Sequence, residues 1–438
     1  MPEQGLRLPP PEAIRQHVLA ALQRYWPIGQ TAIGALPVHR KLDPEISHPL
    51  QMVSVKLPEW GKAYGVNGEI LIPKEACETG EDWYQIDWWL GAFLMLECWH
   101  ERVWEEKQGP IHSYSMRLKG WDERVWQHAW VNRIGLFLRQ WAAEVSNKSP
   151  EHLFGALPQP EFLMTHDVDA VTKTMPIRIK QGVFNLVNAL RALVKGDLSA
   201  AFTRTGQAYR FLFRQDDWSF LDSFISFEQK LQRHGRYHFY ADQRRKTPKR
   251  WLFDPGYDVG DQKVKTFLQR LADSGAEIGL HPSFDSWQDA ALISQQKINL
   301  EAATGISCTV CRQHWLRFSW KGTWTAQETS GILEDTTLMF NDRPGMRNAS
   351  ALAWHPWQPE SNANHQLTAL PTVIMDSHFY DYKPMTMEAR CQAMEHWVNE
   401  CRLVCGQIAV LWHPHTLTKD YGWAQGFEEL VRLIDKEH

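Results

Sequence analysis

The sequence predicts an α/β protein, with a parallel sheet and covering helices over its last 280 or so residues and a smaller aromatic-rich region before them. Two observations predict this. After residue 160, short apolar runs alternate with stretches of helical periodicity, which is typical of parallel α/β architecture. Before residue 155 the alternation is absent and tryptophan is frequent.

The elements follow from the apolar pattern in chain order. Helices are predicted first at 87–106 and 126–142, and the Gly/Pro-containing segment 154–160 is predicted to be a linker. The chain is therefore expected to form an N-terminal domain, 1–155, of unknown role, and a second domain, 160–438. In the second domain we expect strands at 162–165, 237–241, 276–280, 309–312, 372–375 and 408–412, and helices at 263–273, 287–303, 386–405 and 423–434.

Composition narrows the class of protein. The net charge is −4, so no overall basic field favours nucleic acid. The most apolar run, 88–96, is too short for a bilayer, which needs about 20 residues. The N-terminus lacks the features of a secretory signal, and seven scattered cysteines favour reduced thiols. A cytoplasmic protein without a transmembrane segment is expected. The 22 tryptophans could fill a core or stack on sugar rings.

Polar side chains follow five predicted strands. In parallel barrels the reactive groups lie just beyond the carboxyl ends of the strands. We therefore expect one site formed by residues from these five strand ends: Asp167 and Asp169, His281 and Asp285, Arg312 and His314, Asp376 and His378, and His413 and His415.

These motifs, in this order, resemble those of the polysaccharide deacetylases, carbohydrate esterases (family 4-like) with a chitooligosaccharide-deacetylase-like domain. The first family motif, Thr-aromatic-Asp-Asp, corresponds to 165–169, where one residue separates the two acids. The motif with an arginine matches Arg312, and the Leu-x-His motif matches 411–413. The segments 335–347 and 87–142 are similar to parts of a divergent bacterial subgroup with an extra N-terminal domain.

The resemblance implies a deformed (β/α) barrel with about seven parallel strands, plus a smaller aromatic-rich N-terminal α+β domain. It also implies a divalent metal, with Zn favoured and Mn or Fe possible, bound by Asp169 and His281. The family's His-x-x-x-His motif has Asp285 in place of its second histidine. Asp285 is therefore either the third ligand or, with Ser286, a cap of the following helix. In the second case either no metal binds or another histidine supplies the third ligand: His166, His314 or His415.

The resemblance assigns the acid–base roles as well. Asp167 would be the general base, Arg312 would orient it and keep it ionised, and His413 would be the general acid. Arg317 and Arg347 could bind an acidic group of the substrate or be paired within the fold. The side chains expected to bind substrate are Trp315, Arg317 and Arg347.

A basic insertion at 171–220, expected to form two helices, follows the first motif. Between 171 and 214 it has eight basic residues and one acidic residue. Apolar residues recur at helical spacing, including Val183, Leu186, Leu190, Leu193 and Val194. We favour an apolar face that packs on the barrel with a solvated basic face. The alternative is peripheral contact with an anionic membrane.

The leading hypothesis is a metal-dependent hydrolase that removes acetyl from an N-acetylated sugar in a cytoplasmic glycan or surface-polysaccharide precursor. The partner would then be a carbohydrate or glycoconjugate substrate. Two alternatives remain open. One is hydrolysis of a non-sugar C–N bond, and the other is a catalytically degenerate barrel that binds glycan.

Overall fold

An eight-stranded sheet forms the centre of the protein, whose computed structural model describes residues 6–38, 46–77, 80, 82–214, 218, 224–226, 234–382 and 385–436. The strand order is β10-β7-β6-β5-β4-β3-β12-β11, and each neighbouring pair is parallel. The strands are β3 (Glu161–Val168), β4 (Arg236–Phe239), β5 (Glu277–Leu280), β6 (Val310–Cys311), β7 (Glu334–Asp335), β10 (Thr368–Ala369), β11 (Thr372–Met375) and β12 (Gln407–Leu411).

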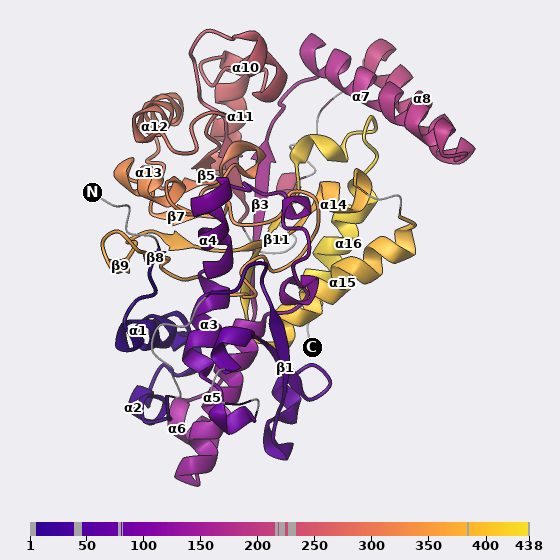
Figure 1. Ribbon diagram of the computed structural model, residues 1–438. Helices are drawn as coiled ribbons and strands as arrows, with labels where there is room; N and C mark the ends of the chain where they lie inside the picture. Colours follow the sequence, from indigo (N-terminus) through magenta and orange to yellow (C-terminus); the bar gives the residue numbers. More distant parts are fainter. Residues whose placement is uncertain are drawn as a thin grey trace.

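The sheet curls into a deformed barrel, and one chain segment connects its two edge strands. Strands β10 and β11 are at opposite ends of the strand order, yet only two residues separate them in the chain. Around this segment, the Leu370 N–H donates to the Asp335 carbonyl, and the Ala409 N–H donates to the Pro371 carbonyl. The predicted deformed (β/α) barrel is confirmed, with eight strands in place of about seven (Figure 1).

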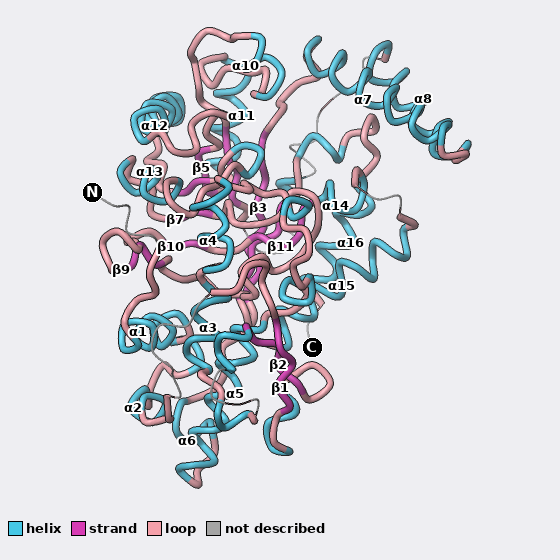
Figure 2. The backbone as a smooth tube through the Cα atoms, viewed as in Figure 1, coloured by secondary structure: helices cyan, strands magenta, loops and turns pink. Residues whose placement is uncertain are grey.

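Helices surround the barrel, as Figure 2 shows. All six predicted strands exist, whereas β7 and β10, with two residues each, were not predicted because so short a run carries no alternation. A small antiparallel pair, β8 (Trp357–Gln358) and β9 (Ala363–Asn364), lies outside the barrel sheet. The helices after β4 are α10 (Pro248–Phe253), α11 (Gln262–Asp273), α12 (Ala290–Thr304), α13 (Thr323–Thr329), α14 (Asp376–Tyr380), α15 (Met387–Leu403) and α16 (Ala424–Asp435).

The described residues between 6 and 154 form the predicted smaller α+β region. The predicted helix 87–106 is two helices, because Cys98 between them has a left-handed backbone with φ 42°. The predicted helix 126–142 begins at Trp130. The elements are α1 (Pro11–Ala21), α2 (Gln30–Gly34), the antiparallel strands β1 (Met52–Lys56) and β2 (Glu69–Pro73), α3 (Trp88–Leu96), α4 (Trp99–Gln108), α5 (Trp130–Ser146) and α6 (Pro150–Phe154).

Many of the tryptophans fill the interior. One continuous hydrophobic cluster contains residues of both the α+β region and the barrel. Its largest fully buried side chains include Trp26, Trp88 and Trp99 from the first region and Trp324 and Trp412 from the barrel. For these rings the structure favours the core use of tryptophan. The division of the chain into domains 1–155 and 160–438 stays a prediction.

A fully buried carboxylate, Glu97, links the α+β region to the barrel. It accepts hydrogen bonds from His17 Nε2 at 2.8 Å, Arg102 Nη2 at 2.7 Å and Trp354 Nε1 at 2.9 Å. Burial alone would raise the pKa of Glu97, but His17, Arg102 and the Trp357 N–H lower it below its usual value. The carboxylate therefore stays charged, and removing one partner would leave that charge uncompensated.

Two further buried ion pairs join the same parts of the chain. Arg133 makes two bonds to Glu400, at 2.9 and 2.7 Å, and His128 Nδ1 lies 3.0 Å from the same carboxylate. Arg347 Nη2 donates to Glu101 at 2.7 Å, and the two side chains are 1% and 3% exposed. These pairs fix the position of the α+β region against the barrel.

The basic insertion forms a helical hairpin of α7 (Met175–Val194) and α8 (Leu198–Phe213) at the edge of the molecule (Figure 1). Some residues of the predicted 171–220 segment, 215–217 and 219–220, lie outside the described residues. The apolar residues of α7 do not pack on the barrel: Val183, Leu186, Leu190, Leu193 and Val194 are all exposed. The favoured packing interpretation is therefore wrong. Among the described helices, none is long and apolar enough to cross a membrane.

Candidate metal centre and acid–base site

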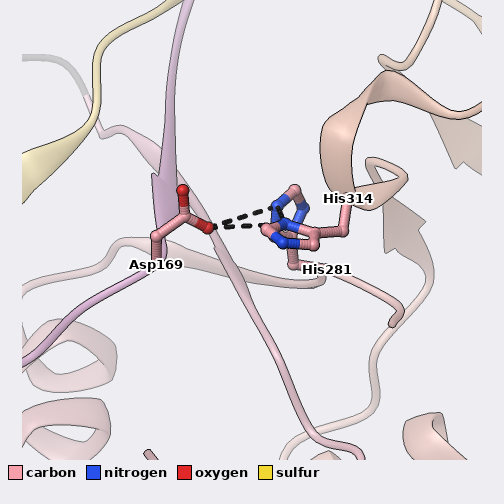
Figure 3. Close-up of side chains that lie close together, drawn as sticks. All are labelled: Asp169, His281 and His314. Atoms are coloured by element: carbon pink, nitrogen blue, oxygen red, sulfur yellow. Dashed lines mark hydrogen bonds and ion pairs between the residues drawn. The ribbon is translucent and has the colours of Figure 1, made fainter. Parts of the chain in front are cut away.

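Three side chains from three strand ends meet at one edge of the barrel. Asp169 follows β3, His281 follows β5 and His314 follows β6 (Figure 3). Asp169 Oδ1 lies 3.6 Å from His281 Nε2 and 3.6 Å from His314 Nδ1, and the two nitrogens are 2.8 Å apart. Within the described residues, these three form the group that could hold a metal ion.

The proton positions on the two histidines follow from their outer partners. His281 Nδ1 lies 2.7 Å from the Arg312 carbonyl, and His314 Nε2 lies 2.7 Å from the Phe253 carbonyl. Because a carbonyl only accepts, each of these nitrogens carries a proton. Burial lowers the pKa of both histidines, which favours the neutral rings. The two nitrogens that face each other are therefore both unprotonated.

A cation between these groups would satisfy all of them. Two lone pairs at 2.8 Å repel each other, and Asp169 Oδ1 is buried with no hydrogen-bond donor in the described structure. Burial raises the pKa of Asp169, so its charge also lacks sufficient compensation. Ligand atoms around tetrahedral zinc lie roughly 3.3 Å apart, given bonds of about 2.0–2.1 Å. The three observed separations, 2.8, 3.6 and 3.6 Å, bracket that value.

Asp285 does not join this group. Its carboxylate pairs with Lys249 Nζ at 2.7 Å, and its side chain is 42% exposed. Neither Asp285 nor Ser286 caps the next helix, so that expectation is wrong: α12 begins at Ala290, where Asp289 accepts a bond from the Leu292 N–H. His314, one of the alternatives for the third ligand, occupies the place beside Asp169.

The other histidines at strand ends lie outside the group as well. His166 Nδ1 is 2.8 Å from the Trp412 carbonyl, and His378 Nε2 is 2.9 Å from the Phe340 carbonyl. Burial is the main reason that the pKa of His415 is lowered to about 3, and the neighbouring His413 charge lowers it further. These three rings are interior groups.

Asp167 lies next to the metal-binding group and is held from one side. Its Oδ1 receives bonds from Arg312 Nη1 at 3.2 Å and from His238 Nδ1 at 3.1 Å. Its Oδ2 is 3.9 Å from His281 Nε2. Burial would raise the pKa of Asp167, but the Arg312 charge and the nearby histidines hold it well below its usual range. Asp167 is therefore an ionised carboxylate with one oxygen directed to the site.

Arg312 is itself fixed on every side. The guanidinium is fully buried and donates to the hydroxyls of Thr165 and Thr372 and to the Thr336 carbonyl. These partners come from β3, from β11 and from the residue after β7, so Arg312 positions Asp167 within the barrel interior.

His413 approaches Asp169 from its other oxygen. His413 Nε2 lies 3.7 Å from Asp169 Oδ2, and His413 Nδ1 lies 2.8 Å from Asp376 Oδ1. Asp376 also accepts from the His413 N–H and the Thr416 hydroxyl. Burial would lower the pKa of His413, but the Asp376 carboxylate dominates and raises it to about 10. His413 is thus a protonated imidazolium beside the metal-binding group at neutral pH.

The side chains expected to bind substrate have different surroundings. Trp315 is 42% exposed and donates to the same Phe253 carbonyl as His314. Arg317 is partly buried, with its guanidinium 4.3 Å from the Phe284 ring. Arg347 is paired with Glu101 in the interior, which is the second of the two alternatives for this residue. Trp315 and Arg317 border the site, and Arg347 does not.

Two residues of the site were assigned no chemical function in the sequence analysis. Asp376 was noted only as a residue at a strand end. Because the carboxyl ends of parallel strands share one edge, its position could have indicated a contact with His413. His238 lies within β4, buried with no exposed surface, and nothing in the local sequence distinguishes it from other strand residues.

Several solved structures are similar to this chain. A protein described as a polysaccharide deacetylase from Mycobacterium smegmatis has 16% identity and a TM-score of 0.37, over 64% of this chain and 88% of its own. A CE4 family pseudoenzyme from Bacillus anthracis has 10% identity and a TM-score of 0.29, over 63% and 60%. A xylanase CE4 domain from the hindgut metagenome of Trinervitermes trinervoides has 9% identity and a TM-score of 0.28, over 63% and 82%.

No family model matches the chain, and the comparison with curated proteins finds no match. The chemistry of the site follows from its own side chains. They provide three metal-binding atoms, an ionised carboxylate on one side and a protonated imidazole on the other.

Proposed function

We propose that the protein is a metal-dependent hydrolase that removes acetyl from an N-acetylated sugar. The observation that carries this proposal is the pair of histidine nitrogens that face each other at 2.8 Å, beside a buried Asp169 Oδ1 that has no hydrogen-bond donor in the described structure. Asp169, His281 and His314 would hold a divalent ion, with zinc the best fit to two imidazoles and one carboxylate. Such an ion lowers the pKa of water to about 7 and polarises an acyl oxygen.

Asp167 is the general base in this proposal. Proton abstraction requires an ionised group with a free oxygen within reach of the attacking water. Arg312 and His238 occupy Oδ1 and keep the carboxylate charged, whereas Oδ2 is directed toward His281. Arg312 is a positioning residue here, because it acts through Asp167.

His413 is the general acid. Departure of an amine from a tetrahedral centre requires a proton, and a group with a pKa of about 10 carries that proton at neutral pH. Asp376 holds Nδ1, so Nε2 is the nitrogen that can donate toward the site. The base and the acid lie on different sides of Asp169, as hydrolysis of a bound acyl group requires.

An aromatic border supports a carbohydrate substrate. The Phe253 and Phe284 rings stack with centroids 4.4 Å apart, and Trp315 lies against both edge-on. Flat apolar rings next to polar groups are typical of small-molecule sites. A glycan or surface-polysaccharide precursor made in the cytoplasm remains the proposed substrate class.

The test is acetate release from an N-acetylated chitooligosaccharide by the zinc-loaded protein. Asp167→Asn removes the base and should lower kcat at least a hundredfold, with zinc content unchanged. Asp285→Asn is the matched control, because this exposed carboxylate lies outside the site, and its kcat should stay within twofold. Rapid hydrolysis by the Asp167→Asn protein would refute the assignment of the base. Loaded wild-type protein that releases no acetate from a panel of N-acetylated sugars would refute the proposed activity.

A further inference from the structure

Exposed apolar side chains are concentrated on the α7–α8 hairpin. Of the 27 large apolar residues that are exposed in the described structure, 13 belong to these two helices. The most exposed are Val194 at 89%, Phe202 at 83% and Leu198 at 71%. Single exposed apolar residues need no explanation, but a contiguous group of this size marks an interaction surface.

These residues form a stripe on each helix. On α7, Ile179, Val183, Leu186, Leu190 and Leu193 follow one another at spacings of three or four residues, which places them on one helical face. On α8, the corresponding face carries Leu198, Phe202, Tyr209 and Phe213.

The two stripes lie on the same side of the hairpin. The helices contact each other through a different face, where the buried residues are small, such as Gly182 and Ala189 on α7 and Ala201 and Ala208 on α8. With 3.6 residues per turn, the stripe on each helix lies about 100° around the helix axis from the contact face, and in the same rotational direction on both helices. In two antiparallel helices, equal turns bring both stripes to one side.

The hairpin is attached to the barrel by other residues. Lys173 pairs with the buried Asp420 at 2.8 Å, and Arg204 lies 3.7 Å from Asp381. The Phe211 ring meets Tyr421 edge-on at 5.0 Å. These contacts hold the hairpin in place and leave both stripes exposed.

The charge beside the stripes identifies the occupant. The segment 171–214 has eight basic residues and one acidic residue, within a chain of net charge −4. Two of the eight, Lys173 and Arg204, are the residues that pair with the barrel. By helical periodicity, the exposed Arg191 and Lys195 lie beside the α7 stripe on the side away from α8. Lys180 instead lies over the Trp251 ring at 5.1 Å, and the acidic Asp197 caps α8. A second copy of this chain would bring like charges together, which is unfavourable. An anionic lipid surface accepts both the apolar stripe and its basic border.

We propose that the α7–α8 hairpin binds the surface of anionic lipid membranes. The helices lie in the interface, with the stripes among the acyl chains and the basic residues at the headgroups. Because α7 begins shortly after Asp169, this contact holds the metal-binding edge of the barrel close to the headgroups. If the proposed deacetylation holds, substrates carried on lipids would reach the site directly.

The test is co-sedimentation of the full chain with vesicles of phosphatidylcholine that contain about one third phosphatidylglycerol. We expect binding to these vesicles and at least tenfold weaker binding to pure phosphatidylcholine. Leu190→Glu with Leu193→Glu should abolish binding. Arg191→Glu with Lys195→Glu should weaken it at least tenfold, given roughly 1 kcal/mol for each basic residue at the surface.

Matched controls are exposed residues elsewhere: Leu333→Glu, at 59% exposure, and Lys321→Glu, with a side chain 66% exposed. Both should bind as the wild type does. Equal binding by all variants, or no binding by the wild type, would overturn the proposal. A wild-type dimer in light scattering that Leu190→Glu with Leu193→Glu dissociates, without vesicle binding, would show that the occupant is a second copy. Binding is measured without turnover, so this result is independent of the proposed activity.

Discussion

His314, rather than Asp285, is expected to determine zinc affinity. In the structure His314 Nδ1 lies 2.8 Å from His281 Nε2 and 3.6 Å from Asp169 Oδ1, whereas Asp285 pairs with Lys249 at the surface. Loss of a residue that merely orients a metal ligand already costs 10- to 100-fold in affinity. Removal of a ligand itself should therefore cost more than a hundredfold, or about 2.7 kcal/mol of binding free energy. Asp285→Asn should change zinc affinity less than twofold.

The measurement is calorimetric titration of zinc into metal-free protein at constant pH. His314→Ala is suitable because the Phe253 carbonyl keeps a donor, the Trp315 indole N–H at 3.1 Å, so the substitution leaves no orphaned acceptor there. Thermal unfolding without metal serves as the folding control. Zinc affinity that is unchanged in His314→Ala but lost in Asp285→Asn would refute this assignment. Asp285 would then be the third ligand, as the spacing of the family motif implies.

Three further predictions concern ion pairs. Arg347→Met should destabilise the protein by about 3–5 kcal/mol in urea unfolding, because it leaves the buried Glu101 charge unpaired, and should leave KM unchanged; a changed KM with normal stability would contradict this. Asp376→Asn should lower the pKa of His413, so kcat should fall at lower pH than in the wild type; a pH profile that does not move would contradict the acid role. Burial would raise the pKa of Glu400, but hydrogen bonds from His128 and Arg133 lower it from 4.5 to about 2. The wild type should therefore lose about 3 kcal/mol of unfolding free energy as the pH falls from 4.5 toward 2, and Glu400→Gln should not.

The barrel could be predicted because its signals are local. An apolar run bounded by turns and followed by helical periodicity identifies a strand of a parallel sheet wherever the run has four or more residues. Strands β7 and β10 have two residues each and are held by neighbours remote in the chain, so no local pattern identified them. The predicted helix 87–106 is divided at Cys98, whose left-handed backbone conformation cannot be predicted from its residue type.

The site could be predicted only in part, for a geometric reason. The strand-end rule placed Asp167, Asp169, His281 and His413 together because the carboxyl ends of parallel strands share one edge. Asp285 was expected beside His281 because three residues lie between the two family ligands, as they do between His281 and Asp285. In this chain that segment is an irregular loop that directs Asp285 to Lys249.

The position of His314 depends on backbone angles that its sequence does not reveal. Trp315 and Leu316 directly after it have left-handed φ values of 57° and 50°. Such angles are unfavourable for large side chains and persist only where the surroundings enforce them, which is common at functional sites. The Phe253 carbonyl, which accepts from both His314 and Trp315, is part of that enforcement.

The direction of the α7 stripe shows what periodicity leaves open. Helices α5 and α7 both carry large apolar residues at helical spacing, yet the stripe of α5 is buried and that of α7 is exposed. The pattern fixes which residues share a face, and the tertiary contacts decide which face is covered. In α7 the covered face is made of small residues such as Gly182 and Ala189, so the large residues contribute little to the stability of this fold. Their size and their basic border are accounted for by a surface outside the chain.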